Sequence, residues 1–91
     1  MRIRWTQAAA DDLESIADYL TIHLPAYTHS SILLINRKVL NLSTFPHMGR
    51  IGREQRTREL VINPLPYIVV YRIQKNVIEI LHIHHGAQNR Q

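Results

Sequence analysis

The chain has 91 residues, of which 45% are apolar and 20% charged, and these values are typical of one globular domain. It contains no cysteine, which excludes disulfide bonds, thiolate metal sites and cysteine nucleophiles. The net charge is +4: residues 1–45 hold four basic and four acidic side chains, whereas residues 46–91 hold seven and three. A basic half favours an anionic partner, either nucleic acid or an acidic protein segment, although a solvated surface accounts for the same balance.

Residues 2–6 alternate polar and apolar side chains, a pattern that predicts a short strand. Thr6 suits the N-cap of the helix that follows, because its hydroxyl can accept a hydrogen bond from a free backbone N–H of the first turn. We expect Trp5 and Tyr19 to pack between this helix and a sheet. The apolar positions of the helix follow the i, i+3, i+4, i+7 rule: Leu13, Ile16, Ala17, Leu20 and Leu24.

Four acidic side chains lie on the same helix, at Asp11, Asp12, Glu14 and Asp18. A group of carboxylates can form a catalytic or metal site, but acids in the early turns of a helix also interact favourably with its dipole. We interpret these four residues as helix stabilisers.

Pro25 cannot continue the first helix and suits the first turn of a second one. The second helix should end near residues 45–46, and the two helices form a hairpin. Residues 46–56 show no helical or strand period, and their glycines and arginines predict a basic connecting loop. The apolar face of the second helix carries four side chains: Ile32, Ile35, Val39 and Leu42.

The rest of the chain predicts three strands, at residues 57–63, 67–73 and 77–84. Residues 64–66 form a proline-rich turn and residues 74–76 a short hairpin turn. The fold class is therefore α+β, in the order β-α-α-β-β-β, with an N-terminal strand and the helical hairpin packed on one face of an antiparallel sheet. We expect one domain over residues 1–91. No apolar run approaches the roughly 20 residues of a membrane span, and the N-terminus shows no secretion signal, so we expect a soluble, cytoplasmic protein.

Arg58, Arg72 and a histidine near the end of the last strand are the candidates for chemistry. Alternation along the strands allows them to converge at one edge of the sheet. Such a group can bind phosphate through guanidinium contacts or perform acid–base chemistry on a ribose hydroxyl. The alternative is that both arginines are solvated on the open side of the sheet. On the last strand, alternation places four side chains on one face: Ile78, Ile80, His82 and His84.

His82 and His84 are spaced so that two imidazoles on a strand could share one metal ion. A third ligand would have to come from His85, His47, His23 or a distant carboxylate, and no familiar spacing supplies one. We therefore expect no metal site and no cofactor, and we interpret these histidines as polar residues at a strand end.

Several segments carry a family resemblance through their order and spacing: WTQAAADDL at 5–13, FPHMGR at 45–50, TREL at 57–60, PYIVVYR at 66–72, VIEIL at 77–81 and HGA at 85–87. Across nearly its whole length the chain resembles the RelE/ParE superfamily of toxins from bacterial type II toxin–antitoxin modules. The resemblance implies growth inhibition, relieved by a cognate antitoxin whose acidic, amphipathic segment wraps the toxin. It implies contact with operator DNA only through that antitoxin.

The branch of the superfamily decides the mechanism. Members that cleave mRNA in the ribosome usually carry an arginine where this chain has Ile68, and basic residues where it has Glu59 and Val61. The chain looks more like the ParE branch, which implies plasmid stabilisation and a non-enzymatic toxin that inhibits DNA gyrase and replication. In that case six arginines are the candidates for target contact: Arg50, Arg53, Arg56, Arg58, Arg72 and Arg90.

Two alternatives stay open. In a RelE-like ribosome-dependent mRNA endonuclease, Arg58 or Arg72 would stabilise the developing charge on the phosphate, and His84 or His85 would be the general acid or base. In an inactive toxin, the chain would act only as an antitoxin-binding module.

Overall fold

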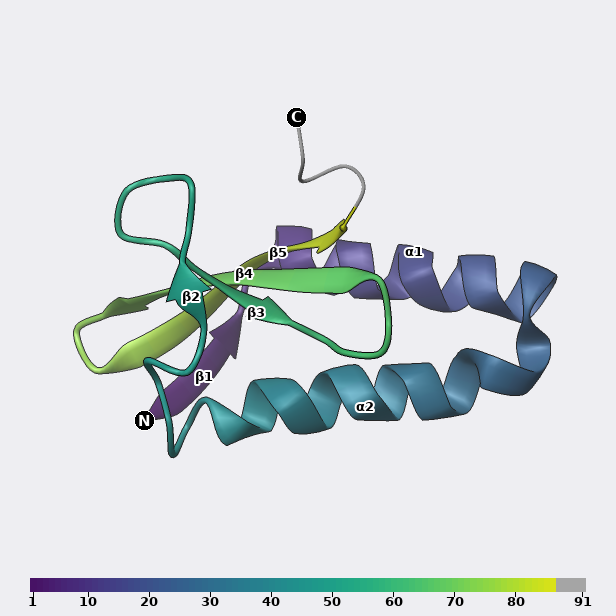
Figure 1. Cartoon of the computed structure of the whole chain (residues 1–91), viewed down its shortest axis with the longest axis horizontal. Helices are drawn as coiled ribbons and strands as arrows, with labels where there is room; N and C mark the ends of the chain where they lie inside the picture. Colours follow the sequence, from purple (N-terminus) through teal and green to yellow (C-terminus); the bar gives the residue numbers. More distant parts are fainter. Residues whose placement is uncertain (87–91) are drawn as a thin grey trace.

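The computed structural model describes residues 1–86, and within them it has five strands, two α-helices and a short 3₁₀ turn (Figure 1). The predicted β-α-α-β-β-β order is confirmed, with one additional short strand after the helices. The elements are β1 (Arg2–Trp5), α1 (Gln7–His23), the 3₁₀ turn η1 (Pro25–Tyr27), α2 (Thr28–Asn41), β2 (Arg50–Ile51), β3 (Arg58–Val61), β4 (Tyr67–Gln74) and β5 (Val77–His85).

The strands form one sheet in the order β1-β5-β4-β3-β2. Neighbouring strands are antiparallel except for β1, which pairs in parallel with β5. The parallel pair arises because the chain leaves β1 through the helical hairpin and returns to its side only with the last strand. The segment 46–56 was expected to be a loop throughout, and β2 within it was missed because two residues are too few to show a period.

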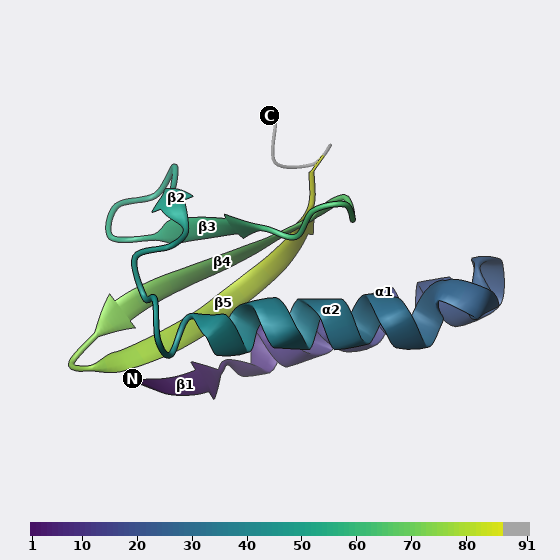
Figure 2. The ribbon, with the colours of Figure 1, turned by 60° about the horizontal axis from the view of Figure 1, so that its bottom comes forward.

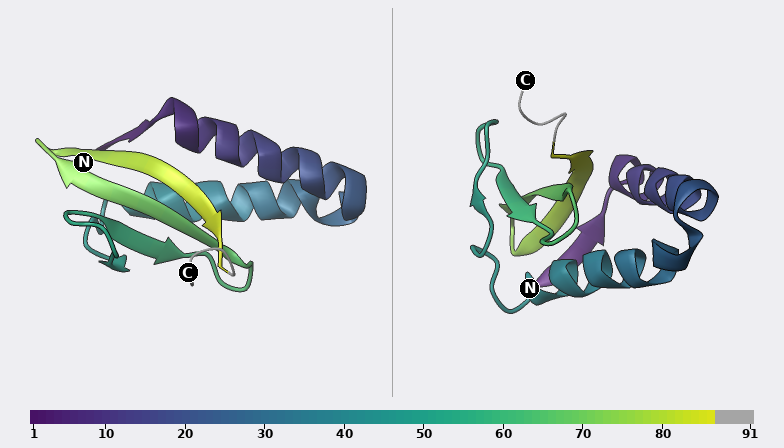
Figure 3. Two further views of the ribbon diagram at one scale, coloured as in Figure 1. Left: turned by 90° about the horizontal axis from the view of Figure 1, so that it is seen from above. Right: turned by 45° about the vertical axis from the view of Figure 1, so that its right-hand side comes forward.

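The helical hairpin covers one face of the sheet and leaves the other open, which gives two layers (Figures 2 and 3). At its η1 end the hairpin extends beyond the ends of the strands (Figure 1). Burial of each large apolar side chain between the layers contributes about 1.5–3 kcal/mol. No helix in the described part of the chain is long and apolar enough to cross a membrane. The core contains Ala9, Ile35, Val39 and Leu42 from the helices and Leu60, Ile62, Tyr67, Val69, Tyr71, Ile78, Ile80 and Ile83 from the sheet side.

Thr6 is the N-cap of α1, as predicted: its Oγ1 accepts a hydrogen bond from the backbone N–H of Ala9 at 3.2 Å. The same hydroxyl donates to the backbone oxygen of Ile80 at 2.7 Å, beyond the point where β1 ends. Asp12 does not have the predicted role, since the first turn of α1 contains no acid. Its carboxylate instead accepts a hydrogen bond from the backbone N–H of Ile83 at 2.9 Å and so continues the pairing of β5.

The second helix is shorter at both ends than predicted. Pro25 begins the 3₁₀ turn η1 rather than the helix, and α2 ends at Asn41, before the expected residues 45–46. Trp5 packs against the core as expected. Tyr19 does not, because it lies near the overhanging end of the hairpin and is 56% exposed.

The hairpin between β4 and β5 turns at Lys75 and Asn76, both with positive φ, which is the geometry of a two-residue hairpin turn. Further along, Val70 pairs with His82 but Tyr71 pairs with Ile80, so Leu81 is an extra residue, a β-bulge. A bulge exchanges the two faces of the strand that follows it. The expectation that His82 and His84 share a face with Ile78 and Ile80 is therefore wrong.

Candidate functional site

The register of the sheet separates the two candidate arginines. Arg58 pairs with Tyr71, whose side chain belongs to the core under the helices, whereas Arg72 pairs with Glu79 on the open face. Directly paired residues project from the same face of a sheet. Arg58 and Arg72 consequently lie on opposite faces, and the structure does not bring them together.

The two histidines considered for acid–base chemistry are also separated. His84 pairs with Ile68 on the open face, and His85 pairs with Tyr67 on the helix-covered face. The His85 ring stands edge-on to the Tyr67 ring, with 6.0 Å between their centroids. Arg58, Arg72 and the two histidines therefore do not form a single site.

Arg58 holds the α2–β2 loop, residues 42–49, against the sheet. Its Nη1 donates to the backbone oxygens of Gly49 at 2.8 Å and His47 at 3.3 Å. The Tyr71 hydroxyl, fully buried beside it, accepts from the backbone N–H of Gly49 at 2.9 Å and donates to the backbone oxygen of Pro46 at 2.8 Å. Burial raises the pKa of Tyr71, so the phenol stays protonated and able to donate.

Only glycine fits at position 49, because any side chain there would clash with its neighbours. A Cβ on this residue would lie 2.7 Å from the Cε1 and the hydroxyl of Tyr71 and 2.9 Å from the backbone oxygen of Glu59. Sequence reasoning treated Gly49 as a loop marker and left Tyr71 unassigned. The available signal was the Pro-x-x-Gly spacing at residues 46–49 together with a tyrosine on the central strand.

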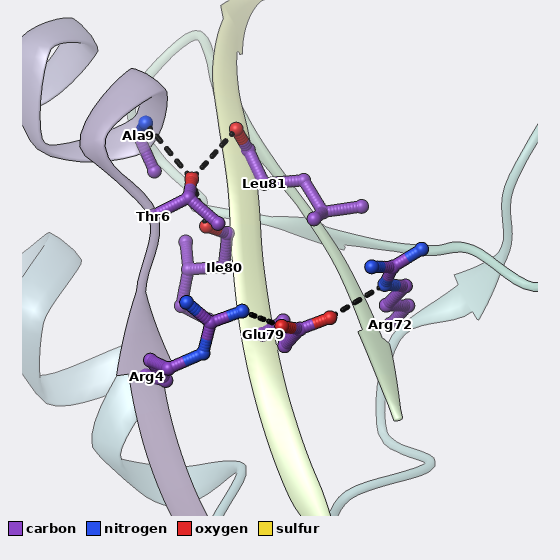
Figure 4. A network of polar contacts seen from close by, with 7 residues as sticks. All are labelled: Arg4, Thr6, Ala9, Arg72, Glu79, Ile80 and Leu81. Carbon is purple, nitrogen blue, oxygen red and sulfur yellow. Dashed lines mark hydrogen bonds and ion pairs between the residues drawn. The ribbon is translucent and has the colours of Figure 1, made fainter. Parts of the chain in front are cut away.

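On the open face, Glu79 is a buried carboxylate between two arginines (Figure 4). Arg72 donates through Nε to its Oε1 at 2.6 Å, and Arg4 pairs with the other oxygen. A carboxylate removed from water needs such partners, because its burial is otherwise strongly unfavourable. Arg2 and Lys75 line the same shallow hollow of about 230 Å³, so this end of the open face is cationic. Glu79 was missed, although a lone acid in an apolar strand was the visible signal.

Arg50 forms a further ion pair on the open face, with Glu59. Its Nε and Nη2 both donate to Glu59 Oε1, at 3.1 and 2.9 Å, while 57% of the arginine side chain remains exposed. Arg53 and Arg56 are exposed in the loop between β2 and β3. Arg90 lies outside the described residues.

His82 and His84 lie together on the open face, with their rings stacked at 5.5 Å between centroids. His82 Nδ1 is 3.4 Å from Asp12 Oδ2, and Asp12 is already bound to the backbone of β5. Across residues 1–86 no three histidine or acidic side chains are grouped so as to hold a metal ion.

An apolar groove of about 490 Å³ lies between the helical hairpin and the turn that joins β3 to β4. Tyr19, Leu24 and Tyr27 line it from the helical side and are each about half exposed or more, at 56%, 49% and 61%. Leu65 and Tyr67 line it from the sheet side. Its apolar lining suits the apolar face of an added helix.

The same arrangement of helical hairpin and sheet occurs in toxin–antitoxin systems. A chain of the chromosomal ParDE toxin–antitoxin system of P. aeruginosa superposes with a TM-score of 0.85 at 26% identity, covering 93% of this chain and 95% of that one. A chain of the toxin–antitoxin complex RelBE2 from Mycobacterium tuberculosis shares the fold, with a TM-score of 0.56 at 20% identity over 92% of this chain and 95% of that one.

Comparison of the sequence with known proteins identifies the toxin family. Residues 3–90 match the family model of the ParE toxin of the type II toxin–antitoxin system parDE. The chain is 40% identical to Y4kP, a proposed toxin of Sinorhizobium fredii. The 87 aligned residues cover 96% of this chain and 90% of that protein. The chain therefore belongs to the ParE toxin family, and the resemblance inferred from its segments is confirmed.

Proposed function

We propose that this toxin inhibits DNA gyrase in the cytoplasm, and thereby replication, and that it does so by contact rather than by cleaving RNA. The observation that carries the proposal is the separation of the candidate nuclease residues. RNA cleavage needs an acid–base group and a cation at the same phosphate. Arg58 is bound to loop carbonyls on one face, and Arg72 is paired with Glu79 on the other.

We further propose that a cognate antitoxin neutralises the toxin, and that operator DNA is reached only through this antitoxin. The net charge of +4 suits an acidic partner. The apolar groove beside Tyr19, Leu24 and Tyr27 suits the apolar face of a helix in that partner.

The test is to induce the chain alone in bacteria and to pulse-label DNA and protein synthesis during the first minutes. The proposal expects DNA synthesis to fall first, and it expects the purified chain to inhibit supercoiling by purified gyrase. An early fall of protein synthesis, with mRNA cut in the ribosomal A site, would instead establish the endonuclease. Harmless overexpression of the folded chain would identify an inactive antitoxin-binding module.

A further inference from the structure

The α2–β2 loop combines a fixed backbone with large apolar side chains that point into solvent. Phe45 is 62% exposed and Met48 is 44% exposed. Both line a shallow hollow of about 550 Å³, together with Thr44, Pro46 and His47. In a small domain with a limited core, two such side chains kept outside the core are a feature of interaction surfaces.

The backbone of this loop is fixed by hydrogen bonds from side chains of the sheet and from the N-terminus. Tyr71 binds Pro46 and Gly49, and Arg58 binds His47 and Gly49. At its N-terminal end the amino group of Met1 donates to the backbone oxygen of Ser43 at 2.9 Å. A loop that is already ordered loses little conformational entropy when its side chains enter a partner.

Cations border the apolar side chains. Met48 also lines a second hollow of about 340 Å³, whose other walls include Lys38 and Arg50. Residues 38–59 contain five basic side chains against two acidic ones, and one of these acids, Glu59, is buried in its pair with Arg50. The partner of this surface should therefore carry carboxylates around an apolar depression.

Resting on the proposed function, we infer that Phe45 and Met48 are the anchors through which the toxin binds its target, and that the target is a protein surface with an apolar pocket bordered by carboxylates. The exposed side chains favour protein over nucleic acid, since a phosphate backbone is bound by cations and gains little from an aliphatic or benzyl group. Aromatic and methionine side chains next to arginine are the residues enriched in the centre of protein interfaces.

The test compares three double variants of the full chain. F45S/M48S removes the anchors, R53Q/R56Q removes two cations of the neighbouring loop, and I22S/L33S is the matched control, which removes exposed apolar groups from the helices (Ile22 is 74% exposed and Leu33 40%). For each variant we would measure the amount of induced toxin that arrests growth, and the melting temperature. Because all these positions are exposed, melting temperatures within about 3 °C of the original chain are expected.

The inference expects F45S/M48S to need roughly tenfold more toxin for growth arrest, R53Q/R56Q to show a smaller loss, and I22S/L33S to match the original chain. Growth arrest by F45S/M48S at the original dose would overturn it. So would the reverse order, in which the arginine variant loses activity and the anchor variant keeps it, as expected for a nucleic-acid partner. If the original chain arrests growth without inhibiting gyrase, only the proposed function fails. The dose needed for growth arrest still measures the role of Phe45 and Met48, whichever protein the target is.

Discussion

At the scale of single residues, Tyr71 shows how one polar atom in a core can position a distant segment. Its ring is buried at the centre of the sheet, and its hydroxyl satisfies one donor and one acceptor of the α2–β2 loop. Buried polar groups of this kind are unfavourable unless they are paired. The phenol therefore couples the position of the loop to the integrity of the core.

We expect Tyr71→Phe to lower the free energy of unfolding by about 1–3 kcal/mol, because Gly49 N–H and Pro46 C=O each lose a partner. Urea denaturation measures the change. Tyr27→Phe is the control, since Tyr27 is 61% exposed, and it should alter stability little. Equal stability of the two variants would show that water replaces the phenol without cost.

The same residue predicts a pH dependence. Burial raises the pKa of Tyr71 above its ordinary value of 10.0, and burial followed by the neighbouring Tyr19 raises that of Tyr67. The folded state thus holds these protons more tightly than the unfolded chain. This contribution to stability is complete below pH 10 and is lost as the pH rises through the higher pKa of the folded state. Urea midpoints at about pH 9 and about pH 11 should show a smaller decline for Tyr71→Phe than for the original chain.

The two histidines at the end of β5 give a second test at this scale, because they lie on opposite faces of the sheet. We expect the double variant H84Q/H85Q to remain fully toxic: within residues 1–86, His84 pairs with Ile68 and His85 with Tyr67, while Arg58 is bound to loop carbonyls and Arg72 to Glu79. The amount of toxin needed for growth arrest is the measurement. Abolished toxicity in a folded double variant would favour the endonuclease.

At the scale of elements, the β1–α1 junction supplies hydrogen-bond partners to the part of β5 that extends past the end of β1. After β1 ends at Trp5, the Thr6 backbone N–H donates to the Ile80 oxygen at 3.1 Å and the Thr6 hydroxyl donates to the same oxygen. One turn further on, Asp12 accepts the N–H of Ile83. The start of the helix therefore replaces the missing residues of a strand.

Thr6→Ala should cost about 1–2 kcal/mol of unfolding free energy, because the helix loses its N-cap and β5 loses a donor. Thr21→Ala is the matched control: its hydroxyl only donates to the Ala17 carbonyl on the exposed side of the same helix. Thermal unfolding followed by circular dichroism compares them. A Thr6 variant as stable as the Thr21 variant would contradict this account of the junction.

At the scale of the whole molecule, two exposed apolar surfaces lie at opposite ends of the helical hairpin. Figure 1 shows these two ends, at the turn between α1 and α2 and at the C-terminal end of α2. The groove beside Leu24 and Tyr27 lies at the η1 end, and the loop with Phe45 and Met48 follows the other end of α2. Because the two surfaces are separate, a substitution in one of them can weaken the binding of one partner and leave the binding of the other unchanged.

We expect Leu24→Glu to weaken neutralisation by a cognate antitoxin by roughly tenfold, since a carboxylate in an apolar groove is unpaired when the groove is covered. Toxicity without the antitoxin should be unchanged. Co-expression at graded antitoxin levels measures this, with Ile22→Glu as the control, since Ile22 is exposed and does not line the groove. Equal protection against both variants would place the antitoxin elsewhere.

Local physical chemistry in the sequence determined the order of the elements other than the two-residue β2, the Thr6 cap, the helical hairpin and the hairpin turn at residues 74–76, and the order and spacing of its segments carried the ParE resemblance. Periodicity, capping and turn chemistry act over a few residues, so a single sequence carries them. What only the tertiary structure decided depends on register between distant strands: the bulge at Leu81, the opposite faces of Arg58 and Arg72, the burial of Glu79 and the Tyr71 contact with Gly49. One extra residue in a strand moves every following side chain to the other face of the sheet, and the local sequence pattern does not reveal such a bulge.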